Sequence, residues 1–218
     1  MKDSYRHKGL RRQLIEELRA KSINDEAVLE AMMTLPRHFF LDKAFEEWAY
    51  SNNAFPIGND QTISQPYTVA YQTSLLSIAP RLKTLEIGTG SGYQAAILSL
   101  LGARVFTVER QEALHLSAKK LLESLKLNPT PRCFFRDGTV GLPEFSPFDR
   151  IIVTAAAPSV PDALRQQLAI GGILVVPVGA EKGQLMLRIT RLSETDFEEK
   201  AFDTFRFVPF LSGVNKKK

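Results

Sequence analysis

A short apolar stretch that runs directly into a glycine-rich turn constrains the fold of this chain more than any other feature. The segment reads Leu85-Glu86-Ile87-Gly88-Thr89-Gly90-Ser91-Gly92-Tyr93, which is the order of a buried strand, a tight turn and the start of a helix. Gly88 and Gly90 allow backbone conformations that a side chain would block, and they let a ligand approach the backbone closely. Because the strand and the helix of a nucleotide fingerprint are both present, we predict a nucleotide-like ligand here.

Alternating strands and helices follow this turn and define the fold class. Each predicted strand is almost continuously apolar, which is typical of parallel strands covered by helices on both faces. The predicted strands are residues 84–87, 104–108, 133–136, 150–154 and 173–178, and the helices between them are residues 93–101, 112–125 and 161–168. Two further strands, 185–191 and 205–211, have no helix between them and indicate an antiparallel edge. We therefore expect an α/β, Rossmann-like fold with a mostly parallel seven-stranded sheet.

The first 80 residues have a different pattern and predict a helical N-terminal extension. Apolar residues recur at helical spacing over residues 10–18 and 28–35, and a polar, loop-like stretch follows. Pro66 suits the first turn of a further helix, with Ser64 or Gln65 as its cap. We expect a single domain, residues 1–218, in which residues 1–80 form the extension and a substrate-side loop and residues 81–218 form the Rossmann-like core.

Composition and charge favour a globular cytoplasmic protein. Hydrophobic residues make up 44% of the chain, and no apolar run approaches the ~20 residues that a membrane span needs. The N-terminus is too polar for a signal peptide. The formal net charge of +4 is scattered apart from a terminal run at residues 216–218, which we interpret as solvated. We expect a monomer with no nucleic-acid partner and no membrane partner.

The metal-ligating residue types are sparse. Cys133 is the single cysteine, which excludes an intramolecular disulfide and offers no ligand cluster. His7, His38 and His115 have no sequence neighbours that suggest catalysis or metal binding, and we expect them to have surface or structural roles. We therefore predict no metal site.

Three acidic residues lie at the ends of three consecutive predicted strands. Glu86 stands two residues before Gly88, Glu109 ends the second strand, and Asp137 precedes Gly138 after the third. Open α/β sheets bind ligands at the carboxyl ends of their strands, so we expect these acids to converge on one crevice. An acid at the end of the second strand is suited to accept hydrogen bonds from both hydroxyls of a ribose.

The glycine spacing indicates which cofactor binds. A dinucleotide fingerprint would place a glycine where this chain has Tyr93, whereas the G-x-G-x-G order after Glu86 resembles the first motif of S-adenosylmethionine-dependent methyltransferases. The resemblance implies that Glu86 lies near the amino-acid part of the cofactor and that Asp137 accepts a hydrogen bond from the adenine amino group. The implied cofactor-binding residues are Glu86, Gly88, Thr89, Gly90, Ser91, Gly92, Glu109, Asp137 and Gly138. The product would be S-adenosylhomocysteine.

A second segment points to one family within this superfamily. The segment Pro56-Ile57-Gly58-Asn59-Asp60-Gln61-Thr62-Ile63-Ser64-Gln65-Pro66-Tyr67 resembles protein-L-isoaspartate O-methyltransferases, particularly the bacterial form. Further matches lie at residues 35–39, 148–156, 171–179 and 207–210, so the resemblance covers nearly the whole chain. Such enzymes methylate the free α-carboxylate of isoaspartyl residues, and the ester closes to a succinimide that partly returns to normal aspartate. The resemblance implies isoaspartyl-containing proteins and peptides as partners.

The chemistry of this reaction fits what the sequence lacks. A carboxylate with a reference pKa near ~4 is already ionised at neutral pH, so no general base is needed. The site must exclude water and hold the carboxylate in line with the methyl group. We predict Ser64 as the catalytic residue, acting by positioning from a helix start that favours an anion. The predicted substrate-binding residues are Thr62, Ile63, Ser64, Gln65, Phe207 and Val208, of which the last two follow from the resemblance.

The chain departs from the family pattern at three positions. Asn59 and Asp60 replace glycines between Gly58 and the Gln-Thr-Ile-Ser stretch, and we expect the turn to survive because both residue types tolerate left-handed backbone. Asp60 also adds negative charge near an anionic substrate. Arg136 replaces a glycine before Asp137, and we expect it to pair with a nearby acid.

Two other functions stay open. A methyltransferase of the same fold acting on a small molecule or RNA would predict a dedicated base or a basic groove, and the sequence indicates neither. A non-catalytic protein that binds isoaspartyl chains as an adaptor is the second alternative.

Overall fold

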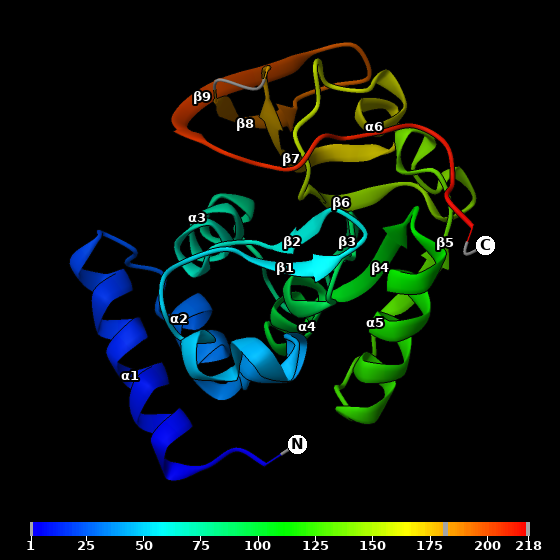
Figure 1. Ribbon diagram of the computed structural model, residues 1–218. Helices are drawn as coiled ribbons and strands as arrows, with labels where there is room; N and C mark the ends of the chain where they lie inside the picture. Colours follow the sequence, from blue (N-terminus) through cyan, green and yellow to red (C-terminus); the bar gives the residue numbers. More distant parts are fainter. Residues whose placement is uncertain (1, 181–182, 217–218) are drawn as a thin grey trace.

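The computed structural model describes residues 2–180 and 183–216, and Figure 1 shows their arrangement. The terminal positions 217 and 218 of the predicted solvated run lie outside the described residues. The extension begins with two α-helices whose starts are capped by side chains: Ser4 accepts from the backbone N–H of His7, and Asp25 accepts from that of Val28. Its elements are α1 (Tyr5–Ala20), α2 (Glu26–Thr34), η1 (Arg37–Phe40), η2 (Lys43–Trp48), β1 (Phe55–Gly58), β2 (Gln61–Ile63) and α3 (Pro66–Leu76).

The hairpin of β1 and β2 contains the turn that the family usually builds with glycines. Asn59 and Asp60 have φ angles of 52° and 55°, so both residues adopt the left-handed conformation. Asn and Asp tolerate this region better than other residues with side chains. The prediction that the turn survives is confirmed, and the hairpin leads directly from Ile63 into the start of α3.

The core is a seven-stranded sheet in the order β5-β4-β3-β6-β7-β8-β9. Strands β3 to β7 run parallel to one another, while β8 is antiparallel to both β7 and β9. The strands are β3 (Lys83–Ile87), β4 (Arg104–Glu109), β5 (Arg132–Phe135), β6 (Phe148–Val153), β7 (Leu168–Val178), β8 (Gln184–Arg191) and β9 (Phe197–Phe205). The predicted fold class, a mostly parallel sheet with an antiparallel edge, is confirmed.

Helices cover both faces of the sheet because alternate strand residues point to opposite sides. The remaining elements are α4 (Tyr93–Leu100), α5 (Glu112–Ser124), η3 (Gly138–Val140), η4 (Pro143–Phe145) and α6 (Asp162–Gln166). Leu85 and Ile87 of β3 pack in a core with residues of η4 and α6, whereas Val105 and Ile152 pack in a second core with α1 to α4. The extension is therefore part of the second core. Within the described ranges, every helix is too short or too polar to span a bilayer.

The predicted final strand at residues 205–211 is wrong. The last strand, β9, instead spans Phe197–Phe205, and it pairs with β8 at the edge of the sheet. Its charged, exposed residues hide the strand in the sequence, because an edge strand with both faces near water has no apolar signature. The apolar residues after it form an extended segment that crosses the carboxyl ends of the strands toward β5 (Figure 1).

Candidate active site

A cavity lies at the carboxyl end of β3, where the strand order reverses between β4 and β6. This is the crevice at which open α/β sheets bind ligands. Predicted site residues from five separate segments line it: Thr62, Ile63, Ser64, Gly88, Thr89, Gly90, Ser91, Glu109, Gly138 and Val208. Gln65 and Phe207 line an adjoining hollow instead, and Glu86, Gly92 and Asp137 line neither.

The glycine loop is held against the end of β6. Thr154 donates its hydroxyl to the carbonyl of Gly88 at 2.7 Å, and a Cβ on Gly88 would lie only 2.5 Å from the same hydroxyl oxygen. Gly88 also has φ of +100°, which disfavours any side chain. Gly92 is the N-cap of α4, with φ of 88°. It packs so closely against Leu122 of α5 that a Cβ there would lie 3.2 Å from that side chain. The predicted need for glycine at the strand end thus has a steric cause.

Glu109 binds the loop from the end of β4. Its Oε2 accepts from the backbone N–H of Gly90 at 2.8 Å, and its Oε1 accepts from that of Gln111 at 2.9 Å. The residue is 5% exposed and lines the cavity. Each carboxylate oxygen can accept a further hydrogen bond, so the side chain can orient the loop and still receive a donor from a ligand.

Glu86 lies deeper than the sequence analysis expected. It is fully buried, and neither carboxylate oxygen has a hydrogen-bond partner of normal geometry within the described part of the chain. Burial raises its pKa to about 8, the Thr107 hydroxyl partly offsets this effect, and the nearby Glu109 adds to it. Glu86 is therefore mostly protonated at neutral pH, in a position beneath the glycine loop rather than on the cavity wall.

Asp137 contacts the segment that follows β9. Its Oδ1 accepts from the backbone N–H of Thr139 at 2.9 Å, and its Oδ2 accepts from that of Gly213 at 2.6 Å. Partial burial acts to raise the pKa of Asp137, but these hydrogen bonds outweigh it and hold the pKa below its usual range. Only the neighbouring Gly138 reaches the cavity. Arg136 pairs with Glu144, which confirms that this departure from the family pattern is accommodated by an acid.

Ser64 lies where the cavity meets the adjoining hollow, which has a volume of about 610 Å³. Both spaces share Thr62, Ser64, Thr154 and Val208 as lining residues. The Ser64 hydroxyl has no hydrogen-bond partner among the described residues, and its side chain is half-buried. A ligand in the cavity and a second ligand in the hollow would therefore meet beside this hydroxyl.

Of the two residues predicted as the cap of α3, Gln65 is the N-cap, and it makes no side-chain capping bond. The backbone N–H of Tyr67 in the first turn donates to Asn52 Oδ1 at 2.9 Å, so one of the donors expected to favour an anion already has a partner. The Ser64 hydroxyl is consequently the more available donor at this helix start.

The segment after β9 supplies the opposite part of the lining. Val208 accepts a hydrogen bond from the backbone N–H of Ala156 at 2.8 Å, and Phe210 donates to the carbonyl of Ala156 at 2.7 Å. These two bonds fix Val208 and Phe210 against the loop after β6, and both residues line the cavity. Phe207 is held by Gln184 Oε1 and lines the hollow.

Gln94 is a cavity residue that the sequence analysis missed. It is 7% exposed, its Nε2 donates to the Thr73 hydroxyl at 2.9 Å, and its Oε1 has no partner within the described residues. An unpaired buried acceptor on a cavity wall is costly unless a ligand or water supplies a donor. The available signal was a polar residue in the first turn of a largely apolar helix.

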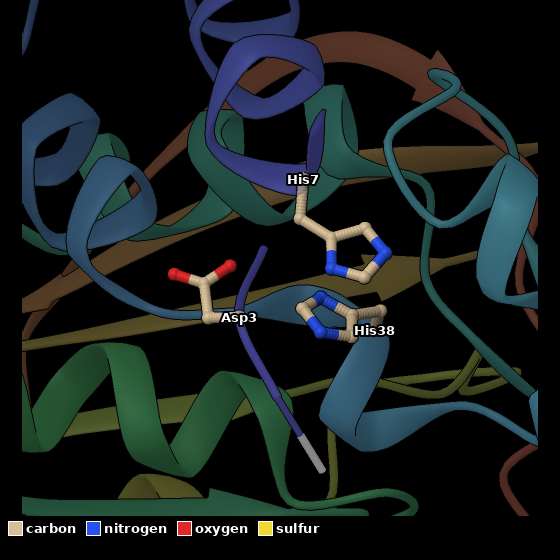
Figure 2. Close-up of side chains that lie close together, drawn as sticks. All are labelled: Asp3, His7 and His38. Atoms are coloured by element: carbon tan, nitrogen blue, oxygen red, sulfur yellow. The ribbon is translucent and has the colours of Figure 1, made fainter. Parts of the chain in front are cut away.

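The structure brings together three titratable residues whose proximity the sequence did not predict. Figure 2 shows Asp3, His7 and His38, whose possible ligand atoms all lie within 4.8 Å of one another. Each already has a protein partner, because Asp3 accepts two hydrogen bonds from Arg11 and His38 Nδ1 lies 2.8 Å from the hydroxyl of Tyr50. His7 Nδ1 accepts from a backbone N–H and its Nε2 lies 3.2 Å from a carboxylate. These contacts describe a structural network.

Comparisons with known proteins agree with this geometry. A curated protein-L-isoaspartate O-methyltransferase of Cytophaga hutchinsonii is 54% identical, with 100% of this chain and 98% of the relative covered, and one of Flavobacterium johnsoniae is 53% identical, with 99% and 100% covered. A solved structure titled protein-L-isoaspartate O-methyltransferase has a TM-score of 0.84 at 27% identity, covering 94% of this chain and 67% of that chain. A second structure, from Plasmodium falciparum, has a TM-score of 0.80 at 22% identity, covers 94% and 98%, and shows the fold alone.

The sequence profile described as protein-L-isoaspartate(D-aspartate) O-methyltransferase matches residues 9–215, nearly the whole chain. With this match and two relatives that are more than half identical over their full lengths, the chain belongs to the protein-L-isoaspartate(D-aspartate) O-methyltransferase family.

Proposed function

We propose that the protein transfers the methyl group of S-adenosylmethionine to the free α-carboxylate of L-isoaspartyl residues in damaged proteins and peptides. The ester would then close to a succinimide, whose hydrolysis returns part of the material to L-aspartyl residues. Membership of the family supports the activity, and the family is named for this acceptor. The observation that carries the proposal is the position of Ser64 at the junction of the cavity and the hollow.

The cavity offers what S-adenosylmethionine requires. Gly88 packs too closely on Thr154 to carry a side chain and its backbone lines the cavity, Glu109 presents a carboxylate suited to ribose hydroxyls, and the buried Oε1 of Gln94 has no donor among the described residues. When bound, the cofactor supplies an electrophilic methyl group on a sulfonium. We propose that the remaining predicted residues Thr89, Gly90, Ser91 and Gly138 surround the cofactor. Glu86 and Asp137 do not line the cavity, and we propose that they support the residues that do.

The acceptor would enter from the hollow. Its lining includes the aromatic side chains of Tyr67, Phe205 and Phe207, which give an extended peptide apolar surface on which to lie. The α-carboxylate needs no base, because it is ionised at neutral pH. The Ser64 hydroxyl would donate to one carboxylate oxygen and direct the other toward the methyl group, which is catalysis by orientation.

A methyl-transfer assay with paired peptides tests the proposal. Labelled S-adenosylmethionine is incubated with the protein and an isoaspartyl peptide or its normal aspartyl twin. We expect label only on the isoaspartyl peptide, and Ser64→Ala to lose most of that transfer. Label on neither peptide would reject the proposal, while equal label on both would reject its specificity.

We also propose that the protein acts as a monomer and without nucleic acid. The scattered charge supports the second part of this proposal, because it gives no basic stripe in the sequence that would follow a phosphate backbone. Light scattering coupled to size-exclusion chromatography measures the mass directly, and a mass near the 24.4 kDa of one chain is expected.

A further inference from the structure

Arg37 is fully buried directly behind Ser64. Its Nη2 donates to the carbonyl of Ser64 at 2.8 Å and to the carbonyl of Asn53 at 3.4 Å. The guanidinium carbon lies 5.0 Å from the centre of the Tyr93 ring. Its Nε and Nη1 have no hydrogen-bond partner among the described residues. The best-formed contact of this side chain is therefore the bond to Ser64.

A buried arginine without a carboxylate is costly. None of the described acids forms an ion pair with Arg37, and burying an unpaired cation carries a penalty of several kcal/mol. Burial lowers the pKa of Arg37 to about 10, and Tyr93 and Tyr50 partly offset this effect. The side chain is thus still charged at neutral pH. An apolar residue would fill the space at lower cost if only packing were required here.

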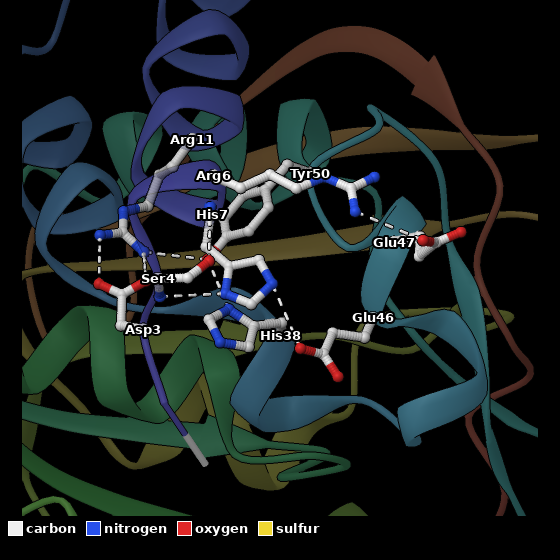
Figure 3. A network of polar contacts seen from close by, with 9 residues as sticks. All are labelled: Asp3, Ser4, Arg6, His7, Arg11, His38, Glu46, Glu47 and Tyr50. Atoms are coloured by element: carbon white, nitrogen blue, oxygen red, sulfur yellow. Dashed lines mark hydrogen bonds and ion pairs between the residues drawn. The ribbon is translucent and has the colours of Figure 1, made fainter.

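The backbone that carries Arg37 is itself anchored by the N-terminal helix. In Figure 3, Asp3 accepts from Arg11, and Arg11 Nη1 donates to the hydroxyl of Tyr50 at 2.9 Å. The same hydroxyl lies 2.8 Å from Nδ1 of His38, the residue next to Arg37 in η1. The network fixes η1, so the guanidinium of Arg37 extends from a rigid base.

We propose that Arg37 is a positioning residue that sets the Ser64 hydroxyl at the junction of the cavity and the hollow. Ser64 lies between the short strand β2 and the N-cap of α3, where regular secondary structure does not fix its backbone. The bond from Arg37 fixes the peptide that follows Ser64, and with it the direction of the side chain. The proposal rests on the proposed function, because it explains how the donor for the acceptor carboxylate is oriented.

The charge of Arg37 adds a second effect at the same place. A cation in a region of low dielectric stabilises an anion placed nearby more than it would in water. The α-carboxylate that the site would bind is such an anion, and Arg37 has no protein acid that offsets its charge among the described residues. We therefore expect a lysine at this position to restore part of the effect and a neutral side chain to restore none.

The test compares Arg37→Met and Arg37→Lys with a matched control at the other end of α3. Arg188 also donates to a backbone carbonyl of this helix, that of Leu75 at 3.0 Å, but far along the helix from Ser64. In Arg37→Met we expect kcat for an isoaspartyl peptide to fall by about 10- to 100-fold, the range for a misplaced catalytic group. Affinity for S-adenosylhomocysteine should stay within about 2-fold, which corresponds to a few tenths of a kcal/mol. Arg37→Lys should regain part of the kcat, and Arg188→Met should leave kcat near that of the unmodified protein.

Several results would overturn the inference. Unchanged kcat in Arg37→Met would do so, as would an equal loss of kcat and of S-adenosylhomocysteine affinity, which indicates general loosening. An equal loss of kcat in the control Arg188→Met would also overturn the inference, because it too would indicate general loosening. If Arg37→Met does not fold, Arg37→Lys carries the test, because it removes the guanidinium that donates to Ser64 and keeps the charge.

A crystal structure of the Arg37 variant separates this inference from the proposed function. If the unmodified protein transfers no methyl group to isoaspartyl peptides, the proposed function fails while the position of Ser64 still decides the role of Arg37. We expect the Ser64 hydroxyl to leave the cavity wall in the variant. An unmoved hydroxyl would reject the positioning role whatever the activity.

Discussion

Replacing Glu86 with glutamine should change how stability depends on pH. In the folded protein burial raises the pKa of Glu86 to about 8, whereas its ordinary value is 4.5. The folded state therefore binds this proton more tightly than the unfolded state does. Its stabilising effect is complete below pH 4.5 and is lost as the pH rises toward 8. Since one pKa unit corresponds to 1.36 kcal/mol, the full difference amounts to about 5 kcal/mol, of which about 3–4 kcal/mol is lost between pH 5 and pH 8.

Urea unfolding at pH 5, 6, 7 and 8 measures this effect. Glutamine has nearly the same shape and no charge, so Glu86→Gln removes the titration and adds a constant offset at most. We expect the free energy of unfolding of the variant, relative to the unmodified protein, to rise by about 3–4 kcal/mol from pH 5 to pH 8. Groups remote from Glu86 titrate equally in both proteins and cancel in the difference. Parallel pH profiles for the two proteins would show that Glu86 is solvated or paired in solution and would refute the reasoning.

Three further substitutions test the cavity. Ser64→Ala should lower turnover on an isoaspartyl peptide while calorimetry finds S-adenosylhomocysteine affinity nearly unchanged; a matching loss of both would mean that Ser64 is chiefly structural. Glu109→Ala should weaken S-adenosylhomocysteine binding by about 1–3 kcal/mol, because charged hydrogen bonds are lost together with the bond that orients Gly90. Undiminished affinity would remove Glu109 from the site. Gly88→Ala should cost about 1–3 kcal/mol of stability, since it combines a positive φ with a Cβ 2.5 Å from the Thr154 hydroxyl, and thermal melts should show no stabilisation by S-adenosylhomocysteine. A normal ligand-induced shift would contradict that steric argument.

The parallel core could be predicted because its signals are local. Apolar strands such as β4 and β6 and the turn at Gly88 are specified by adjacent residues, and their predicted bounds lie within a few residues of those observed. The turn at Asn59 and Asp60 was predictable for the same reason, because left-handed backbone is a property of the residue type.

The misses share a different cause, which is dependence on distant parts of the chain. β9 forms a strand because its backbone pairs with the free edge of β8, and the exposed residues of β9 give no periodic signal. Gln94 faces the cavity only because α4 packs in a particular orientation on the sheet. The contact between Asp137 and Gly213, which lie 76 residues apart, is likewise invisible in the sequence.

The side-chain roles of the acids were only partly accessible. Glu109 reaches the cavity, as its strand-end position suggested, whereas Glu86 occupies an inner strand position beneath the loop. A sequence motif places a residue along a strand, but the depth of its side chain depends on which neighbours pack above it. Arg37 and His38 illustrate the same limit, because nothing adjacent to them in the chain indicates the contacts to Ser64 and Tyr50.

The segment after β9 also has a consequence for the order in which the molecule assembles. Asn215 donates hydrogen bonds to the carbonyl of Arg110 and to Gln111 Oε1, and Arg110 Nε donates to the carbonyl of Gly213, across intervals of more than 100 residues. On a ribosome, the turn after β4 is synthesised long before the segment that covers it. We therefore expect a nascent chain to complete its central strands while this end of the crevice still lies open to solvent, and to bind a ligand there fully only after the tail has docked.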